Sequence, residues 1–304
     1  MAILPVVLFH AGVRPVSGGF VGVDIFFVIS GYVITRSLLH HQAEGKLSLL
    51  GFYNRRVRRL FPALFAVLIV TSIAAAALLL PRALKTYGAM LIACAVSLSN
   101  IFFYRETGYF DTSAAEKPLL HTWSLSVEEQ FYFVWPTLLG FLFIPRLHPY
   151  RIWLTAAALI GSFALSVWMT LHNLSGGFYL PQSRAWELVL GAILALAPLR
   201  LGVTVRHAFS VASLIMMGGA ILLFTGETPF PGVAAALPAL GAALAIMAND
   251  QGDTLGAKIL SWRPVVYVGL ISYSLWCCQV NSTGSQRPRP HPDVHAAAVA
   301  AAHV

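Results

Sequence analysis

Four arginines lie within five positions, at Arg55, Arg56, Arg58 and Arg59, directly before an apolar segment. Positive residues commonly anchor the cytoplasmic ends of membrane spans, and that role alone would explain most such clusters. This cluster contains only arginine, and a guanidinium can bind a phosphate through two parallel hydrogen bonds. On a helix, Arg55, Arg56 and Arg59 would share one face. We therefore predict that this face binds a donor carrying several phosphates.

The densest group of reactive side chains lies at positions 118–132. It contains His121, Ser124, Glu128 and Glu129. Adjacent acids at the entrance of a membrane span are costly unless they are paired or solvated. A capping box formed by Ser126 and Glu129 at the start of a helix would explain one acid. It leaves His121 and Glu128 unexplained, so both are candidates for the reaction.

Other ionisable residues lie near the ends of apolar segments, where each is a functional candidate because a charge in lipid is expensive. His10 could act as a base or simply form a helix-end hydrogen bond. Asp24 could contribute to the chemistry or cap a helix. Arg184 and Glu187, which follow Tyr179, are three positions apart and could pair with each other on a helix, or Arg184 could contact a substrate. We expect Tyr179, Arg184 and Glu187, with His121 and Ser124, to form an acceptor-binding or structural site.

The composition indicates which elements must position these residues. Hydrophobic residues make up 58% of the 304-residue chain and charged residues only 11%, about half the charged share of soluble domains. Lipid is the solvent that suits such a chain. The net charge of +8 is concentrated beside an apolar segment, which argues against a nucleic-acid partner. Three cysteines, two of them adjacent, provide no disulfide framework.

Ten apolar segments could enter or cross a hydrocarbon core about 30 Å thick as helices. We therefore expect an all-α polytopic bundle of about ten spans over residues 1–280, followed by a polar, Ala-rich and disordered tail at 281–304. The first segment is short and apolar sequence stops after Cys278, so we expect a chain truncated at both ends. The ten segments are 3–11, 20–39, 60–80, 84–104, 131–144, 152–171, 185–199, 208–225, 233–248 and 265–280.

The loops differ in their content of Lys and Arg, which predicts their side of the membrane. Loop 36–59 carries six and is expected in the cytoplasm, whereas segments 172–183 and 226–232 carry none and are expected outside. Three apolar segments separate two loops that both read as cytoplasmic, so one segment cannot cross. We expect segment 84–104, which polar residues interrupt, to be re-entrant or to lie at the outer surface.

This topology places His10, Asp24, Glu128 and the pair of Arg184 and Glu187 on the outer side, opposite the arginine cluster. Because these residues share the outer side, we expect them to form one site. An acid–base cluster would then face outside, with phosphate-binding arginines on the inner side and a helical bundle between them.

Taken in order, these motifs closely resemble the acyltransferase 3 family of integral-membrane O-acyltransferases. The resemblance extends from His10 to Leu275, and the order of the motifs makes it specific. It rests on His10, the GVDIFFVISG run at 22–31, RRxxRLxP at 55–62, HTWSLSVEEQFY at 121–132, RxWEL at 184–188, PFPG at 229–232 and GLISYSL at 269–275.

The resemblance implies transfer of an acyl group, often acetyl from acetyl-CoA, to a carbohydrate hydroxyl at the bacterial inner membrane. Typical acceptors would be lipopolysaccharide O-antigen, exopolysaccharide or peptidoglycan-type glycans. His10 matches the family's proposed catalytic histidine, Arg56 and Arg59 match its arginine motif, and Glu128 with Glu129 fall in its Glu-Glu-Gln motif. Acyl-CoA would be a substrate, and neither a tightly bound cofactor nor a metal is expected.

In the resulting hypothesis, His10 deprotonates the acceptor hydroxyl while Asp24 or Glu128 orients its imidazole. A glycan or lipid transporter (a flippase) is the alternative from another class, because buried acids and arginines would serve it too. An inactive remnant is a third interpretation. The family normally has an Arg or Lys eleven residues before the histidine, and a His-Trp-Pro run where Trp276–Gln279 and a polar tail stand here.

Overall fold

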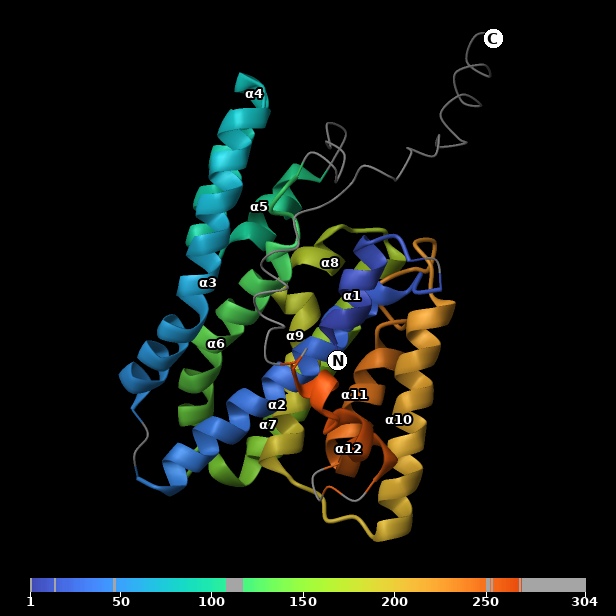
Figure 1. Cartoon of the computed structure of the whole chain (residues 1–304). Coiled ribbons are helices and arrows are strands. Elements are labelled where there is room, and N and C mark those ends of the chain that lie inside the picture. The colour runs from blue at the N-terminus through green and yellow to red at the C-terminus, as the bar shows by residue number, and fades with distance from the viewer. Residues whose placement is uncertain are drawn as a thin grey trace, which may run out of the picture.

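The computed structural model describes residues 2–13, 15–45, 48–107, 117–249, 252, 254–267 and 269. Within these residues the chain forms helices and no strands (Figure 1). The helices are α1 (Ile3–His10), α2 (Gly22–Ala43), α3 (Leu49–Leu78), α4 (Pro81–Ala95), α5 (Ser99–Glu106), α6 (Thr122–Leu142), α7 (Arg151–Leu171), α8 (Gly176–Tyr179), α9 (Pro181–Leu196), α10 (Val203–Leu223), α11 (Ala236–Asn249) and α12 (Leu255–Leu260), with 3₁₀ turns at Gly19–Val21 and His148–Tyr150. The all-α fold is as predicted.

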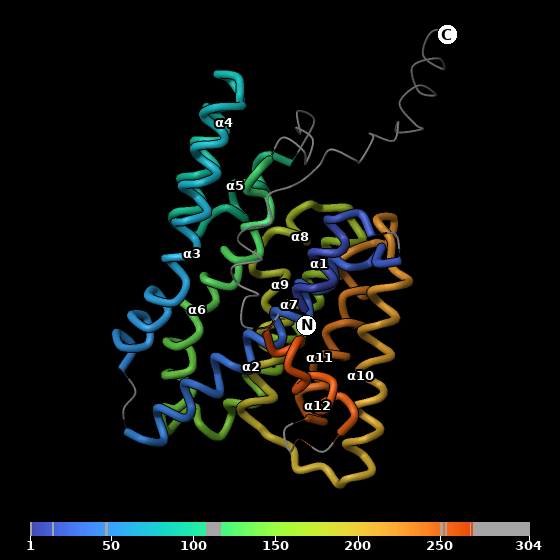
Figure 2. Tube along the Cα trace, in the orientation of Figure 1, coloured from blue at the N-terminus to red at the C-terminus, as the bar shows by residue number. Residues whose placement is uncertain are grey.

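Helices α2 and α9 pack closely at the centre of the bundle, with α3 and α4 on one side and α10 on the other (Figure 2). Two glycines allow this approach. A Cβ atom added to Gly31 would lie 1.8 Å from the carbonyl oxygen of Leu188, and one added to Gly191 would lie 1.9 Å from that of Val28. Small residues at such contacts are the usual means by which membrane helices pack backbone against backbone.

Replacing Gly31 with alanine is therefore expected to destabilise the bundle, because α2 and α9 must separate to admit the methyl group. Overpacking typically costs about 1–3 kcal/mol. Gly140→Ala in α6 is the matched control, since an added Cβ there meets no atom within 4 Å and alanine favours a helix. The melting temperatures of the two variants in detergent check the prediction, and equal values would contradict it.

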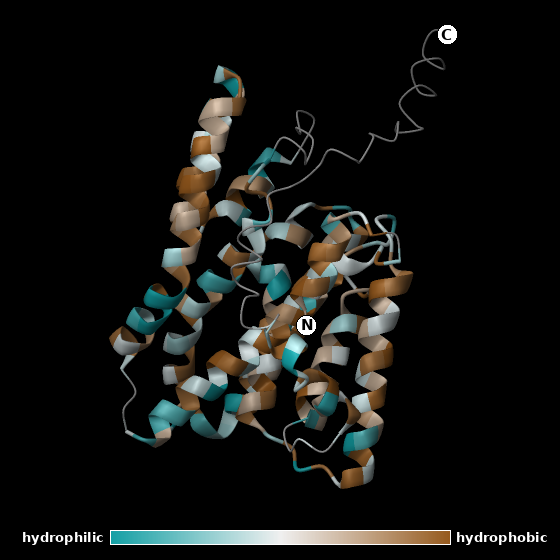
Figure 3. Cartoon of the chain, viewed as in Figure 1, coloured by the Kyte–Doolittle hydropathy of each residue, from teal (hydrophilic) through white to brown (hydrophobic). Residues whose placement is uncertain are grey.

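Four helical segments are long and apolar enough to cross a membrane: Gly19–Ala43, Leu49–Leu78, His148–Leu171 and Val203–Leu223. Their outward faces are apolar (Figure 3); on α3, for example, Val70 and Ile73 are each 67% exposed. Such faces require lipid and not water. The structure thus agrees with a membrane protein, but it does not confirm the expected count of about ten spans.

The expected segment 84–104 is not one span. It divides into α4 and α5 at a break where Ser97 has a φ of +56°, a left-handed conformation that is uncommon for a residue other than glycine. This agrees with the expectation that the segment does not cross as a single helix. Most of segment 265–280, and all of the tail at 281–304, lie outside the described residues.

The start of α6 corrects another expectation. The helix begins at Thr122 and not near Ser126, and its N-cap residue, His121, makes no side-chain capping bond. Ser126 faces α5 instead, with its Oγ 2.7 Å from the Oγ of Ser99. The capping-box alternative is therefore excluded, because Ser126 instead makes a polar contact between two helices.

Candidate functional site

A buried ion cluster joins α2 to α9. Nη1 of Arg184 lies 3.0 Å from Oδ1 of Asp24 and 3.0 Å from Oε1 of Glu187, and none of the three side chains is exposed. The predicted pairing of Arg184 with Glu187 is confirmed. Asp24 does not cap α2, whose N-cap residue is Val21, because its carboxylate pairs with Arg184 instead.

Aromatic rings surround the guanidinium of Arg184. Its Cζ atom lies 5.6–5.9 Å from four ring centroids, within the range of cation–π attraction. The rings belong to Phe27, Trp123, Phe178 and Phe230. Ion pairs and rings together hold Arg184 in one position, so it presents a fixed positive charge.

His10 lies at the edge of this cluster, in a cavity of about 220 Å³. The cavity contains His10, His121, Tyr179 and Arg184, all of which the sequence singled out, and the rest of its wall is apolar or aromatic. Chain segments more than 170 positions apart are thus brought to one site. The remaining lining residues are Val6, Phe9, Phe20, Val23, Leu120, Trp123, Phe178 and Phe230.

The imidazole of His10 is oriented by the backbone. Its Nδ1 lies 2.8 Å from the carbonyl oxygen of Val6, and because a carbonyl can only accept, the hydrogen resides on Nδ1. In the neutral imidazole, Nε2 is then the nitrogen with the free lone pair that a general base requires. The expectation that Asp24 or Glu128 orients the imidazole is therefore wrong: a backbone carbonyl four residues earlier does so, and Asp24 is engaged by Arg184.

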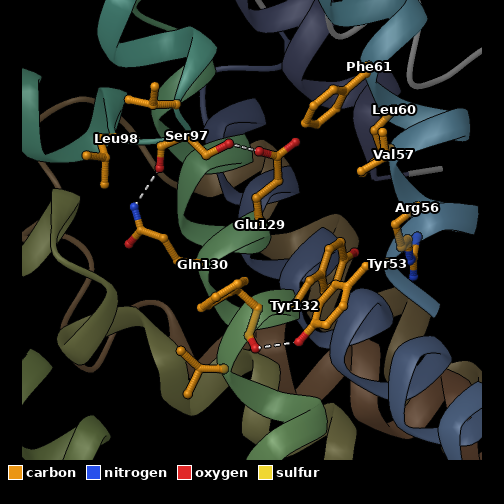
Figure 4. A pocket seen from close by; sticks show the side chains of 13 residues that line it. Tyr53, Arg56, Val57, Leu60, Phe61, Ser97, Leu98, Glu129, Gln130 and Tyr132 are labelled. Atoms are coloured by element: carbon orange, nitrogen blue, oxygen red, sulfur yellow. Dashed lines mark hydrogen bonds between the residues drawn. The ribbon is translucent and has the colours of Figure 1, made fainter. Parts of the chain in front are cut away.

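A second cavity, of about 390 Å³, lies between α3, the α4–α5 break and α6 (Figure 4). Arg56 lies at its wall, with Cζ 4.5 Å from the ring centroid of Tyr132. Glu129 faces it and accepts a hydrogen bond from the Ser97 hydroxyl. Gln130 donates from Nε2 to the carbonyl oxygen of Ser97, at 2.8 Å. One arginine of the cluster thus shares a cavity with the Glu-Glu-Gln motif.

Glu128 is buried on the other side of the same helical turn, where Ser30 and Tyr132 donate hydrogen bonds to its carboxylate. The positive charges of Arg56 and Arg59 act on this carboxylate. The structure therefore places Glu128 and Glu129 with the arginines and not with His10. The expected cluster therefore forms only in part: His10 shares a cavity with Arg184, which pairs with Asp24 and Glu187, but α6 carries Glu128 about two turns away from His121.

Three of the predicted site residues, Arg55, Arg59 and Ser124, line neither of these two cavities. Arg55 and Arg59 are exposed, so both remain accessible to a ligand in solution. Ser124 is buried within the first turn of α6, where its Oγ donates to the carbonyl oxygen of His121 at 3.4 Å. It lines neither of the two cavities, so we find no acceptor-binding role for it.

Sequence reasoning missed several residues of the site. Val6 carried no signal, because the contribution of a backbone carbonyl does not depend on the side chain. Ser97 and Asn100 are among the polar residues that interrupt segment 84–104, and nothing in the sequence assigns them a role in the site. Asn100 in fact connects the two cavities: its Oδ1 accepts from Nε2 of Gln130 at 2.8 Å, and its Nδ2 donates to the carbonyl oxygen of Tyr179 at 3.1 Å.

Comparisons with known proteins identify the family of the chain. A family model described as an acyltransferase domain, that of the acyltransferase 3 family, matches residues 1–281. The chain is 32% identical over 300 residues to the peptidoglycan O-acetyltransferase OatA of Listeria monocytogenes, covering 91% of this chain and 47% of that protein. It is 30% identical over 293 residues to the O-acetyltransferase OatA of Staphylococcus aureus, covering 90% of this chain and 48% of that protein.

The chain is also 31% identical over 246 residues to a protein of Haemophilus influenzae that is named only as uncharacterized. This match covers 76% of this chain and 99% of that protein. The chain spans about half the length of the two O-acetyltransferases. No solved structure matches.

Proposed function

Because the chain belongs to the acyltransferase 3 family, we propose that it transfers an acyl group from acyl-CoA to a hydroxyl of an envelope carbohydrate. The donor is acetyl-CoA from the cytoplasm, and the protein is a multi-pass protein of the bacterial inner membrane. Among the acceptors, we favour a peptidoglycan-type glycan over O-antigen or exopolysaccharide, because the similar protein of Listeria monocytogenes is named as a peptidoglycan O-acetyltransferase.

The His10 cavity is the observation that carries this proposal. Nε2 of His10 takes the proton of the sugar hydroxyl as the oxygen attacks the acyl carbon. An ester bond forms, the bond from the acyl carbon to its carrier breaks, and the carrier leaves with the electron pair of that bond and takes up the proton. A positioned general base contributes about 10²–10⁴-fold to such a reaction. The aromatic walls offer flat apolar surfaces to the C–H faces of a sugar ring, and Arg184 offers a fixed hydrogen-bond donor.

The second cavity, between α3, the α4–α5 break and α6, is the proposed binding site of the donor, and we call it the Arg56 cavity. Arg56 lies at its wall, while Arg55 and Arg59 are exposed on the same helix and accessible to the phosphates of CoA. Apolar side chains dominate the rest of the wall, which suits the pantetheine arm; Val57, Leu60 and Phe61 are examples. The hydrogen bonds of Asn100 lead from this cavity to Tyr179 beside the His10 cavity.

Consumption of acetyl-CoA tests the proposal against a transporter. Membrane vesicles containing the full-length protein should release CoA and accumulate O-acetylated glycan when supplied with acetyl-CoA. A flippase would move the glycan and ignore the donor. CoA release no faster than from vesicles without the protein would contradict the proposed function.

Replacing both Arg56 and Arg59 with lysine should raise the KM for acetyl-CoA by at least about tenfold, although the charge is kept. Lysine lacks the planar fork that binds a phosphate through two hydrogen bonds, and hydrogen bonds to charged groups contribute about 1.5–3 kcal/mol each. Arg82→Lys, at an exposed residue of α4, is the matched control. An unchanged KM in the double variant would leave the arginines as topology anchors only.

A further inference from the structure

A third cavity adjoins the His10 cavity, at the end of the bundle where α8 lies (Figure 1). Its volume is about 250 Å³, and it is lined by the end of α7, the α7–α8 connection, α8 and the α10–α11 connection. Apart from Thr170, its lining belongs to segments 172–183 and 226–232, which carry no Lys or Arg and which the sequence places outside. The polar wall consists of Thr170, Asn173 and Ser175, none of which was a predicted site residue.

Phe178 and Phe230 line both this cavity and the His10 cavity, so the two cavities meet at these rings. Both rings are held in place. The ring centroid of Phe178 lies 4.5 Å from that of Trp123, and the centroid of Phe230 lies 4.9 Å from that of Phe20. The guanidinium of Arg184 contacts both rings, at 5.9 and 5.7 Å. A ligand could therefore occupy both cavities while contacting two fixed aromatic side chains.

The volumes favour one ligand that extends over both cavities. At about 220 and 250 Å³, each is smaller than the roughly 300–1,000 Å³ of ordinary ligand sites, whereas the two together fall within that range.

The chemistry of the third cavity suits a neutral sugar. The amide of Asn173 can donate to and accept from sugar hydroxyls. The Ser175 hydroxyl, which accepts from Thr107, can donate, and the Thr170 hydroxyl, which donates to the carbonyl oxygen of Ser166, can accept. No charged side chain is among the described residues that line it, which argues against a phosphate or a carboxylate as the ligand. The aromatic wall complements the apolar face of a ring.

We propose that the third cavity binds the sugar unit next to the one that is acylated, so that the acceptor is a glycan chain and not a single sugar. The inference rests on the proposed function. It also assigns a role to the Pro229–Gly232 motif: Phe230 separates the two sugar positions. Contacts to a unit that does not react raise kcat/KM, because their binding energy helps to orient the reacting hydroxyl.

The experiment compares two acceptors, N-acetylglucosamine and its β-1,4-linked tetramer, with the full-length protein in membrane vesicles. Asn173→Gly removes the amide without strain, because Asn173 has a φ of +52°, a conformation that glycine adopts readily. Ser175→Phe fills the cavity with a ring. His172→Gly is the control, since His172 is an exposed neighbour that lies outside the lining.

The unaltered protein should show a kcat/KM at least roughly tenfold higher for the tetramer than for the single sugar. Asn173→Gly and Ser175→Phe should bring this ratio close to one without changing kcat/KM for the single sugar, and His172→Gly should retain it. Equal kcat/KM for both acceptors in the unaltered protein would overturn the inference, as would variants that slow both acceptors equally. Acetylation of neither acceptor would contradict the proposed function itself.

Discussion

Replacing His10 with alanine is expected to lower glycan O-acetylation by about 10²–10⁴-fold per molecule of inserted protein, the contribution of a positioned general base. His10 lies in the acceptor cavity, and its Nδ1 bond to Val6 leaves Nε2 available to take the proton of the hydroxyl. The KM for acetyl-CoA should stay unchanged, because His10 does not line the Arg56 cavity.

His41→Ala is the matched control for this prediction. His41 makes the same kind of bond, from Nδ1 to the carbonyl oxygen four residues earlier, at 2.7 Å, but it lines neither the His10 cavity nor the Arg56 cavity. Turnover is measured as acetylated glycan per unit of correctly inserted protein. If His10→Ala turned over normally, His10 would have only a packing role, and His121, which lines the same cavity, would be the next candidate base.

Replacing Arg184 with methionine is expected to prevent the protein from accumulating in folded form. The change leaves Asp24 and Glu187 facing each other in a fully buried site without a counter-charge. Removing one partner of a buried ion pair costs about 3–5 kcal/mol, which approaches the entire stability of many domains, about 5–15 kcal/mol. Four aromatic rings also lose the cation they surround.

Two further variants separate charge from packing. The triple variant Arg184→Met, Asp24→Asn and Glu187→Gln removes all three charges with little change of shape, and it should recover much of the folded protein. Arg105→Met, at an exposed arginine of α5, should have no effect. The fraction of monodisperse protein in detergent is the measurement. Normal folding of Arg184→Met alone would show that the cluster does not stabilise the bundle.

The sequence by itself determined the class of the protein and most of the candidate residues. Apolar composition and segment length depend only on residue type, so the membrane assignment did not need the fold. The pairing of Arg184 with Glu187 was predictable because residues three apart on a helix are neighbours in any fold. The order of the motifs indicated the family that the comparisons confirm.

Only the tertiary structure decided which of these residues act together. Asp24 pairs with Arg184 across 160 positions because Gly31 and Gly191 let α2 and α9 pack backbone against backbone. The Arg56 cavity contains Glu129 because the break at Ser97 brings the α4–α5 connection against α6. The base is oriented by the Val6 carbonyl. Long-range packing and backbone atoms produce these contacts, and neither leaves a periodic pattern in the residue types.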